Sequence, residues 1–295
     1  MYLEHFGLEQ APFTITPDTG FFLDHGSHRE AMNVLQLALQ SGEGFIKVTG
    51  EVGTGKTLLC RRLLNTLDDK FVTAYIPNPC LNPVALRMAL AEELGIGFAR
   101  NIGQHRLLQQ ITQCLIKLNA AGKQVVLLLD EAQSIPDDSM EALRLLTNLE
   151  TEKDKLLQVV LFGQPELDHR LQQFHMRQLR QRILFNYTLQ PLDRDTLEIY
   201  INHRLLVAGY RGAPLFTRNA LKLLHRNSRG IPRLANILCH KALLSAYGRG
   251  DRVIRPLHIR HASVDTEDVA PRRHRLAIAS VLLGMAGTGL FNAWY

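Results

Sequence analysis

The sequence is poor in cysteine and tryptophan and contains no repeated segment. It has 4 cysteines and 1 tryptophan in 295 residues, and the cysteines are scattered, without a CxxC pair or clustered histidine partners. This spacing provides neither a zinc site nor a disulfide framework, so we expect reduced thiols in the cytoplasm. The N-terminal stretch MYLEHFGLEQAPF lacks the basic start and the continuous apolar run of a signal peptide. We therefore expect the bulk of the chain to stay in the cytoplasm.

The bulk composition is that of an ordinary globular protein with a small excess of positive charge. Hydrophobic residues make up 46% of the chain and charged residues 21%, which excludes the disordered class. The formal net charge is +6. An excess of this size fits binding of a polyanion such as ATP, of an acidic membrane surface or of nucleic acid, and it does not choose among them.

Between residues 41 and 190, short apolar runs alternate with helical patterns. The apolar runs cover residues 45–50, 71–76, 124–130, 155–163 and 183–190. Such alternation predicts an α/β fold in which a parallel sheet carries helices on both faces. We expect residues 41–190 to form this core and residues 1–40 to be an N-terminal segment that packs on it.

After Pro191 the strand patterns stop and only helical patterns continue. Three helices separated by turns with glycine or proline are predicted, over residues 192–210, 217–228 and 231–248. They indicate a small all-helical lid domain that extends over residues 191–268.

The segment from Gly50 to Thr57, GEVGTGKT, matches the phosphate-binding pattern GxxxxGK[ST]. Its glycines let the backbone wrap closely around phosphates, and the helix that follows adds its positive N-terminal dipole. Lys56 is expected to reach the β- and γ-phosphates, and the Thr57 hydroxyl to bind Mg²⁺. The predicted ATP-binding residues are Gly50, Glu51, Val52, Gly53, Thr54, Gly55, Lys56, Thr57 and Leu58.

A second half of the same site follows the apolar run of VVLLLDEAQ. This strand ends in Asp130, so its carboxylate is expected at the carboxyl edge of the sheet, where ligands of such sheets bind. We expect Asp130 to hold Mg²⁺ through water. Glu131 is expected to polarise the water that attacks the γ-phosphate. The two motifs together predict an ATP hydrolase that uses Mg²⁺.

Three further features favour the AAA+ group among P-loop proteins. Gln164 ends the apolar run of VVLFGQPEL, where AAA+ proteins carry the sensor 1 group. In GIPR, Arg233 stands at the start of a lid helix and is a candidate sensor 2 residue, which adds it to the predicted ATP-binding and catalytic residues. The segment MRQLRQRI supplies candidates for an arginine finger that reaches a neighbouring subunit's nucleotide: Arg177, Arg180 and Arg182. We favour Arg182, because it lies closest to the following strand.

Several segments resemble the AAA+ ATPases of the ExeA/GspA type over roughly residues 1–265. They include PDTGFFL, GEGFIKVTGEVGTGKT, LLLDEAQ, LFGQPEL and GIPRLANIL. The resemblance implies an ATPase that assists assembly of a type IV pilus of the MSHA kind or of a type II secretion complex. It also implies partners among these assembly proteins at the inner membrane, and association with its own copies in a ring such as a hexamer. The secretion-type members continue into a peptidoglycan-binding domain that this sequence does not contain, so the resemblance does not carry over direct binding to the cell wall.

The last twenty residues, 276–295, contain no charged side chain. Twenty helical residues span about 30 Å, the thickness of the hydrocarbon core of a bilayer. A basic linker, 269–275, precedes them, and the aromatic residues Phe291, Trp294 and Tyr295 end them. These flanks predict a single transmembrane helix that contacts lipid and holds the ATPase on the cytoplasmic face of the bacterial inner membrane. A buried or peripheral helix of a soluble domain is the alternative.

Other functions are compatible with parts of the pattern. A DNA-associated AAA+ regulator, similar to transposition ATPases, is supported by the basic balance and by the arginines of the lid. However, no helix-turn-helix or other nucleic-acid module is recognisable, so nucleic acid is not an expected partner. A helicase would need a second P-loop domain, which is lacking. A nucleotide-binding scaffold that turns over slowly without its partner remains an open alternative.

Overall fold

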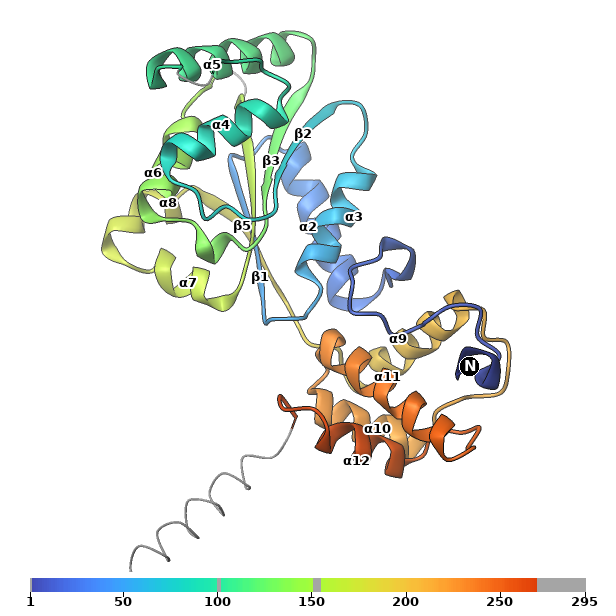
Figure 1. Ribbon diagram of the computed structural model, residues 1–295. Helices are drawn as coiled ribbons and strands as arrows, with labels where there is room; N and C mark the ends of the chain where they lie inside the picture. The colour runs from blue at the N-terminus through green and yellow to red at the C-terminus, as the bar shows by residue number, and fades with distance from the viewer. Residues whose placement is uncertain (1, 100–101, 151–154, 270–295) are drawn as a thin grey trace, which may run out of the picture.

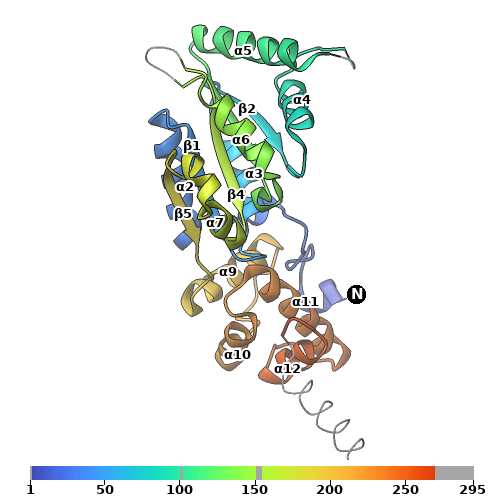
Figure 2. The same cartoon turned by 90° about the vertical axis from the view of Figure 1, so that its left-hand side faces the viewer.

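The computed structural model describes residues 2–99, 102–150 and 155–269 (Figure 1). An α/β core stands above a smaller all-helical lid, and the two meet beneath the carboxyl ends of the core strands (Figures 1 and 2). In the order of the chain, the core strands are β1 (Phe45–Gly50), β2 (Phe71–Ile76), β3 (Gln124–Leu129), β4 (Gln158–Gly163) and β5 (Ile183–Leu189).

The five strands form one parallel sheet in the order β2-β3-β4-β1-β5. Strands β3 and β4 are buried along nearly their whole length, which explains their continuous apolar sequences. β5 lies at an edge and alternates between exposed and less exposed residues. This architecture confirms the predicted parallel sheet with helices on both of its faces.

Each face of the sheet is covered by its own set of helices. One face packs against α2 (Gly26–Gln40) and α3 (Lys56–Thr66) through side chains such as Val48, Val126 and Phe162. The alternate strand residues, such as Phe45 and Leu127, point to the opposite face. The helices on that face are α4 (Pro83–Glu93), α5 (Gln104–Ala120), α6 (Asp137–Leu146), α7 (Pro165–Leu171) and α8 (Arg177–Arg180).

The lid contains one helix more than the three predicted. Its helices are α9 (Arg194–Val207), α10 (Arg218–Ser228), α11 (Pro232–Gly248) and α12 (Pro256–Val264). The unpredicted helix is α12, which buries only His258, Ile259 and Ala262. So few apolar positions give little helical periodicity, and it is packing against α10 and α11 that stabilises this short helix.

The N-terminal segment does not pack on the core alone, so the prediction for residues 1–40 is corrected. Only α2 covers the sheet. The helix α1 (Tyr2–Phe6), the residues after it and the 3₁₀ turn η1 (Thr19–Phe21) bury Phe6, Phe13 and Phe21 in the lid cluster. Phe13 meets Phe216 of the lid edge to face, with ring centroids 6.1 Å apart. The large apolar area of these aromatic rings is what draws the segment to the lid.

Within residues 2–99, 102–150 and 155–269, no helix combines the length and the apolar composition needed to cross a bilayer. The predicted transmembrane segment, 276–295, lies outside the described residues, as does most of the basic linker.

Candidate nucleotide-binding site

The loop between β1 and α3 has the backbone shape that close wrapping of phosphates requires. Gly53 and Gly55 have φ angles of 82° and 100°, in the region that side chains disfavour. A Cβ on Gly53 would lie 2.6 Å from Cβ of Arg233, and a Cβ on Gly55 would lie 2.8 Å from Nε2 of His28. The glycines are therefore required both by their conformation and by the close approach of these neighbours.

His28 is a residue that sequence reasoning missed. It lies on α2, is buried, and its Nε2 is 2.9 Å from the carbonyl oxygen of Thr54. Burial lowers the pKa of this imidazole, and the bond to Thr54 opposes the shift in part. His28 thus packs against the loop of residues 50–57, which we call the phosphate loop, and bonds to its backbone. This role depends on the packing of α2 against the loop, which a sequence pattern does not show.

The side chain of Lys56 lies inside the loop. It is buried, and its ammonium group donates to the carbonyl oxygens of Gly50 at 2.7 Å and Glu51 at 3.0 Å. Burial lowers the pKa of Lys56, while the nearby carboxylates of Glu131 and Asp130 raise it. Since its hydrogen-bond partners in the described structure are neutral carbonyl groups, the ammonium charge can serve an anionic ligand.

Thr57 and Asp130 meet in the position predicted for a metal ion. The hydroxyl of Thr57 donates to Oδ2 of Asp130 at 2.6 Å, and Oδ1 of Asp130 accepts from the backbone N–H of Glu131 at 2.9 Å. Burial raises the pKa of Asp130, and the bond from Thr57 opposes the shift. A hydroxyl and a carboxylate beside a lysine and a phosphate-binding loop fit Mg²⁺, which prefers oxygen ligands and keeps several waters.

Glu131 occupies a strained backbone position directly after Asp130. Its φ of 52° lies in the left-handed region, which costs a residue with a side chain about 1–3 kcal/mol. Its Oε2 accepts from Nε2 of Gln133 at 2.5 Å and from Nε2 of Gln164 at 2.9 Å. The structure thus brings Gln164 to the carboxylate of Glu131, and it adds Gln133, which no sequence motif indicated.

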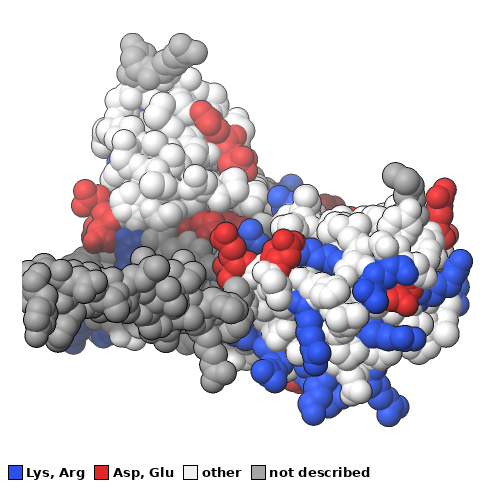
Figure 3. Space-filling view, turned by 60° about the horizontal axis from the view of Figure 1, so that its bottom comes forward, with Lys and Arg blue, Asp and Glu red and all other residues white. Residues whose placement is uncertain are grey.

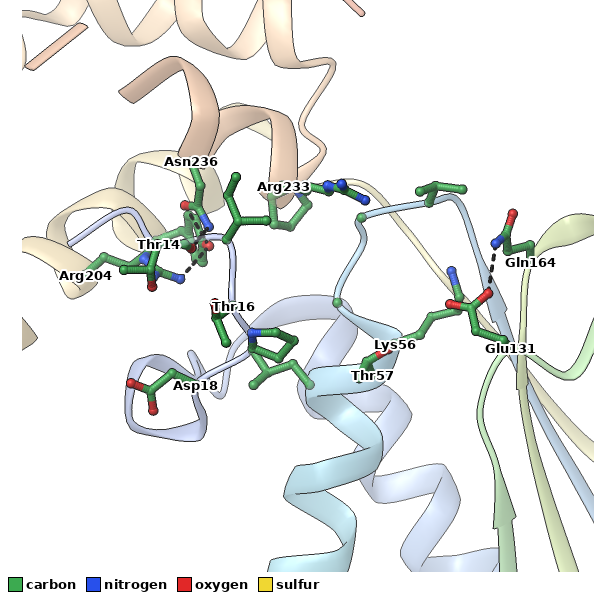
Figure 4. A pocket seen from close by; sticks show the side chains of 18 residues that line it. Thr14, Thr16, Asp18, Lys56, Thr57, Glu131, Gln164, Arg204, Arg233 and Asn236 are labelled. Atoms are coloured by element: carbon green, nitrogen blue, oxygen red, sulfur yellow. Dashed lines mark hydrogen bonds between the residues drawn. The ribbon is translucent and has the colours of Figure 1, made fainter. Parts of the chain in front are cut away.

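A cleft of about 350 Å³ lies between the phosphate loop, the N-terminal segment and the lid. Figure 4 shows its lining, with Lys56 and Glu131 at one end and Arg204 and Asn236 at the other. The lining residues include Val52, Gly53, Gly55, Lys56, Thr57, Leu58, Glu131, Gln164 and Arg233 of the predicted set. An elongated cleft with the phosphate loop at one end has the form that a nucleotide needs.

The far end of the cleft is formed by residues that sequence reasoning missed. They come from the N-terminal segment, Thr14–Asp18, and from the lid: Tyr200, Arg204, Pro232 and Asn236. The Pro-containing stretch APFTITPDTG predicts only that these residues are extended and does not indicate that they line the cleft. Its place in the cleft follows from tertiary packing on the lid.

Arg204 ties the N-terminal segment to the lid. It is 5% exposed, its Nε donates to the carbonyl oxygen of Pro12 at 2.5 Å, and its Nη1 donates to the Tyr200 hydroxyl at 3.1 Å. The guanidinium also lies over the ring of Phe21, 4.5 Å from its centroid. Tyr200 in turn donates to Oδ1 of Asn236 at 3.0 Å. This network holds the wall of the cleft opposite the phosphate loop.

Arg233 stands at the contact between lid and loop. Its backbone N–H donates to the carbonyl oxygen of Gly53 at 3.1 Å. Its side chain is exposed and lies along the cleft above the loop (Figure 4). The first turn of α11 is thereby attached directly to the phosphate loop.

The three candidate arginine fingers differ in their surroundings. Arg182 is half-buried, and its Nη1 donates to the carbonyl oxygen of Arg144 at 3.3 Å and to Thr147 at 3.4 Å, at the end of α6. Arg177 and Arg180 are exposed on α8. Arg182, the residue favoured from the sequence, therefore already makes hydrogen bonds within its own chain.

Comparison with known families and proteins agrees with this geometry. Residues 39–171 match the family described as "AAA domain". The chain is 46% identical over 254 residues to General secretion pathway protein A of Aeromonas hydrophila, an alignment that covers 86% of this chain and 46% of that protein. The chain therefore spans about half the length of the curated relative that it matches.

Solved structures show the same fold at low sequence identity. Cdc6p from Pyrobaculum aerophilum has a TM-score of 0.64 at 19% identity, covering 85% of this chain and 71% of its own. The Aeropyrum pernix ORC1 protein in complex with DNA has a TM-score of 0.62 at 19% identity, covering 87% and 69%. The Thermotoga maritima RuvB Holliday junction branch migration motor has a TM-score of 0.51 at 14% identity, covering 89% and 76%. At these identities the likeness concerns the fold alone.

Proposed function

Because this chain belongs to the AAA+ ATPases of the ExeA/GspA type, we propose that it binds and hydrolyses Mg-ATP to drive assembly of a secretion or pilus complex. The observation that carries the proposal is the joining of two motifs. Thr57 of the phosphate loop and Asp130 at the end of β3 are 73 residues apart, yet their oxygens are 2.6 Å apart. This pair lies beside the buried ammonium of Lys56 at one end of the cleft.

The residues of the chain have separate roles in the proposed reaction. The backbone N–H groups of the loop and Lys56 hold the phosphates, and Thr57 and Asp130 hold Mg²⁺. When bound, Mg²⁺ neutralises negative charge on the phosphates. The carboxylate of Glu131 takes a proton from the attacking water, and the amides of Gln164 and Gln133 keep that carboxylate in place.

The lid is proposed to report the state of the nucleotide. Arg233 belongs to α11 and is attached to the phosphate loop through its backbone, so contact of its side chain with the phosphates would hold the lid against the core. Loss of the γ-phosphate would remove this contact, which is how such switches couple hydrolysis to domain movement.

The proposed partners are further copies of the chain and assembly proteins at the inner membrane. A ring would place an arginine of one subunit at the nucleotide of the next. The exposed Arg177 and Arg180 suit this role better than Arg182, whose guanidinium already bonds to α6. The relative's name supports a secretion system, and an MSHA-type pilus is the proposed variant. Attachment to the membrane through residues 276–295 is part of the same proposal.

The test is the ATPase rate per chain, measured against protein concentration in detergent. We expect the rate to rise with concentration, and Glu131→Gln to abolish it at every concentration. Arg177→Ala and Arg180→Ala should each be measured beside Arg182→Ala. The last variant is the matched control, because Arg182 already bonds to the end of α6. Loss of the concentration-dependent part in one of the first two variants would support a finger supplied by the neighbour.

Two results would contradict this proposal in different ways. An undiminished rate in Glu131→Gln would remove the hydrolytic site. A rate independent of concentration in the wild type, with all three arginine variants unaffected, would leave a monomeric ATPase and remove the ring.

A further inference from the structure

The lid carries a surface of predominantly positive charge. Residues 191–268 contain thirteen Lys and Arg against seven Asp and Glu, an excess of +6 that equals the net charge of the whole chain. Figure 3, which brings the lower end of the molecule forward, shows Lys and Arg side chains spread over the lid. The charge is thus concentrated at the end of the molecule away from the sheet.

Two neighbouring helices, α10 and α12, form the surface that we name the lower lid face. They are joined where Nδ2 of Asn227 donates to Oγ of Ser263 at 2.7 Å, and both lie at the end of the molecule opposite the sheet (Figures 1 and 2). The exposed basic side chains of this face are Arg218, Lys222 and Arg226 of α10 and Arg260 of α12. Within the described residues none of these four forms an ion pair, so their charges are available to a partner.

Acidic side chains flank this face on both sides of α12. Before the helix, Oδ2 of Asp251 lies 3.1 Å from Nε2 of His258 and 3.6 Å from Nε of Arg249. The other acidic residues follow the helix. Asp265 is paired with Lys241 at 2.7 Å, which neutralises it. Glu267 and Asp268 follow and are exposed. They reduce the positive charge at the end of the lid but do not interrupt the basic residues of the two helices.

The lower lid face also exposes aliphatic side chains. Leu257 is 40% exposed and Val264 is 82% exposed. Since they stand seven residues apart on α12, with Arg260 between them, all three side chains share one side of the helix. An anionic lipid interface can take up both groups, the cations at its headgroups and the aliphatic side chains at the acyl boundary, whereas the backbone phosphates of a nucleic acid would engage the cations and leave Val264 exposed.

We propose that the lower lid face docks on an anionic phospholipid bilayer. The described chain ends at Val269, directly after α12, and Arg272, Arg273 and Arg275 come next in the sequence before the uncharged segment 276–295. The inference rests on the membrane attachment in the proposed function and specifies which surface of the protein meets the lipid. Docking in this way leaves the nucleotide cleft, on the opposite side of the lid, open to solvent and to partners.

The test uses the full chain in lipid nanodiscs, with an environment-sensitive fluorophore on Val264→Cys. Cys80 and Cys114 are replaced by serine so that the fluorophore reacts only with the introduced cysteine. Cys60 and Cys239 are kept, because they are buried. Discs of phosphatidylcholine are compared with discs that also contain phosphatidylglycerol. We expect a blue shift of the emission only with the anionic lipid, and its loss in high salt. The control label, on Gln113→Cys of α5, is exposed on the core and should not respond.

A charge-reversal variant tests the basic residues directly. Each cation near an anionic surface strengthens docking about fivefold, so Lys222→Glu, Arg226→Glu and Arg260→Glu together should weaken it by at least about a hundredfold. The matched control reverses three exposed cations far from the lid, Arg106, Lys117 and Lys123. It should dock as the wild type does.

Each alternative result has a definite meaning. Chains recovered in both kinds of disc without a shift at Val264→Cys would overturn lipid docking but leave attachment and hydrolysis intact. Chains recovered in neither disc would refute the membrane attachment itself. Binding to a labelled DNA duplex that the lid variant loses, without any lipid response, would assign the face to nucleic acid and overturn the proposal. The ATPase rate in detergent reports separately on the proposed hydrolysis.

Discussion

From the contact between Gly53 and Arg233 we predict how much nucleotide affinity is lost when the lid is pushed away from the phosphate loop. An alanine at Gly53 would have to adopt a φ of 82°, at a cost of about 1–2 kcal/mol. Its Cβ would lie 2.6 Å from Cβ of Arg233, so the lid would have to move by roughly 0.8 Å to restore ordinary contact. This movement would weaken the bond from the Arg233 N–H to Gly53, which contributes about 0.5–1.5 kcal/mol.

Together these terms amount to about 1.5–3.5 kcal/mol, and the middle of this range corresponds to a loss of nucleotide affinity on the order of 50-fold for Gly53→Ala. The loss is expected because the cleft is formed jointly by the lid and the loop. Fluorescence anisotropy of a labelled ATP analogue, titrated with the protein, measures it directly.

A double-mutant cycle separates backbone strain from the clash. Arg233→Gly removes the Cβ in question, so Gly53→Ala should cost only the strain of about 1–2 kcal/mol in that background. Gly95→Ala, measured through the free energy of unfolding, gives the cost of strain alone, because Gly95 has a φ of 69° with no atom near its Cβ position. An equal loss of affinity from Gly53→Ala in both backgrounds would refute the clash between lid and loop.

Three further changes have definite expected outcomes. Burial lowers the pKa of His28 below its usual 6.5. As the pH falls through 6.5, the unfolded chain therefore takes up a proton before the folded chain does, and the folded state loses stability. His28→Gln removes this group and should lessen the fall in Tm between about pH 7.5 and about pH 5.5. Gln164→Ala should reduce kcat by about 10²-fold with little change in nucleotide affinity, because it removes a bond that positions Glu131. Arg204→Met should lower the free energy of unfolding in urea by about 2–4 kcal/mol, since its partners lose charge-assisted bonds in a buried site. Arg211→Met, at an exposed site, should change it by about 0.5 kcal/mol or less.

These outcomes can each fail in a recognisable way. An unchanged pH profile of Tm in the His28 variant would mean that this imidazole titrates normally. A loss of affinity equal to the loss of kcat in Gln164→Ala would make this residue a ligand of the nucleotide and not a positioning residue. Equal stability of the Arg204 and Arg211 variants would show that the buried network contributes nothing.

Local sequence was enough to predict the parallel core and one end of the site. The phosphate loop depends on the conformational freedom of Gly53 and Gly55 and on the start of a helix, both of which are local properties. Asp130 could be placed because the carboxyl ends of parallel strands meet at one edge of the sheet. The predicted neighbours Lys56, Thr57 and Glu131 follow from the same rule and line the same cleft in the structure.

Tertiary packing decided the rest of the cleft. The N-terminal segment was expected on the core, but its Phe6, Phe13 and Phe21 are buried in the lid, and Arg204 attaches it there through Pro12. The support of the loop by His28, and the engagement of Arg182 with the end of α6, also join residues far apart in the chain. The sequence by itself therefore determined the loop proposed to bind phosphate, because its glycines, Lys56 and Thr57 lie in one short segment. Only the tertiary structure decided that the N-terminal segment and the lid form the other wall of the cleft. Their contacts depend on burial of apolar surface between segments far apart in the chain, which leaves no local sequence pattern.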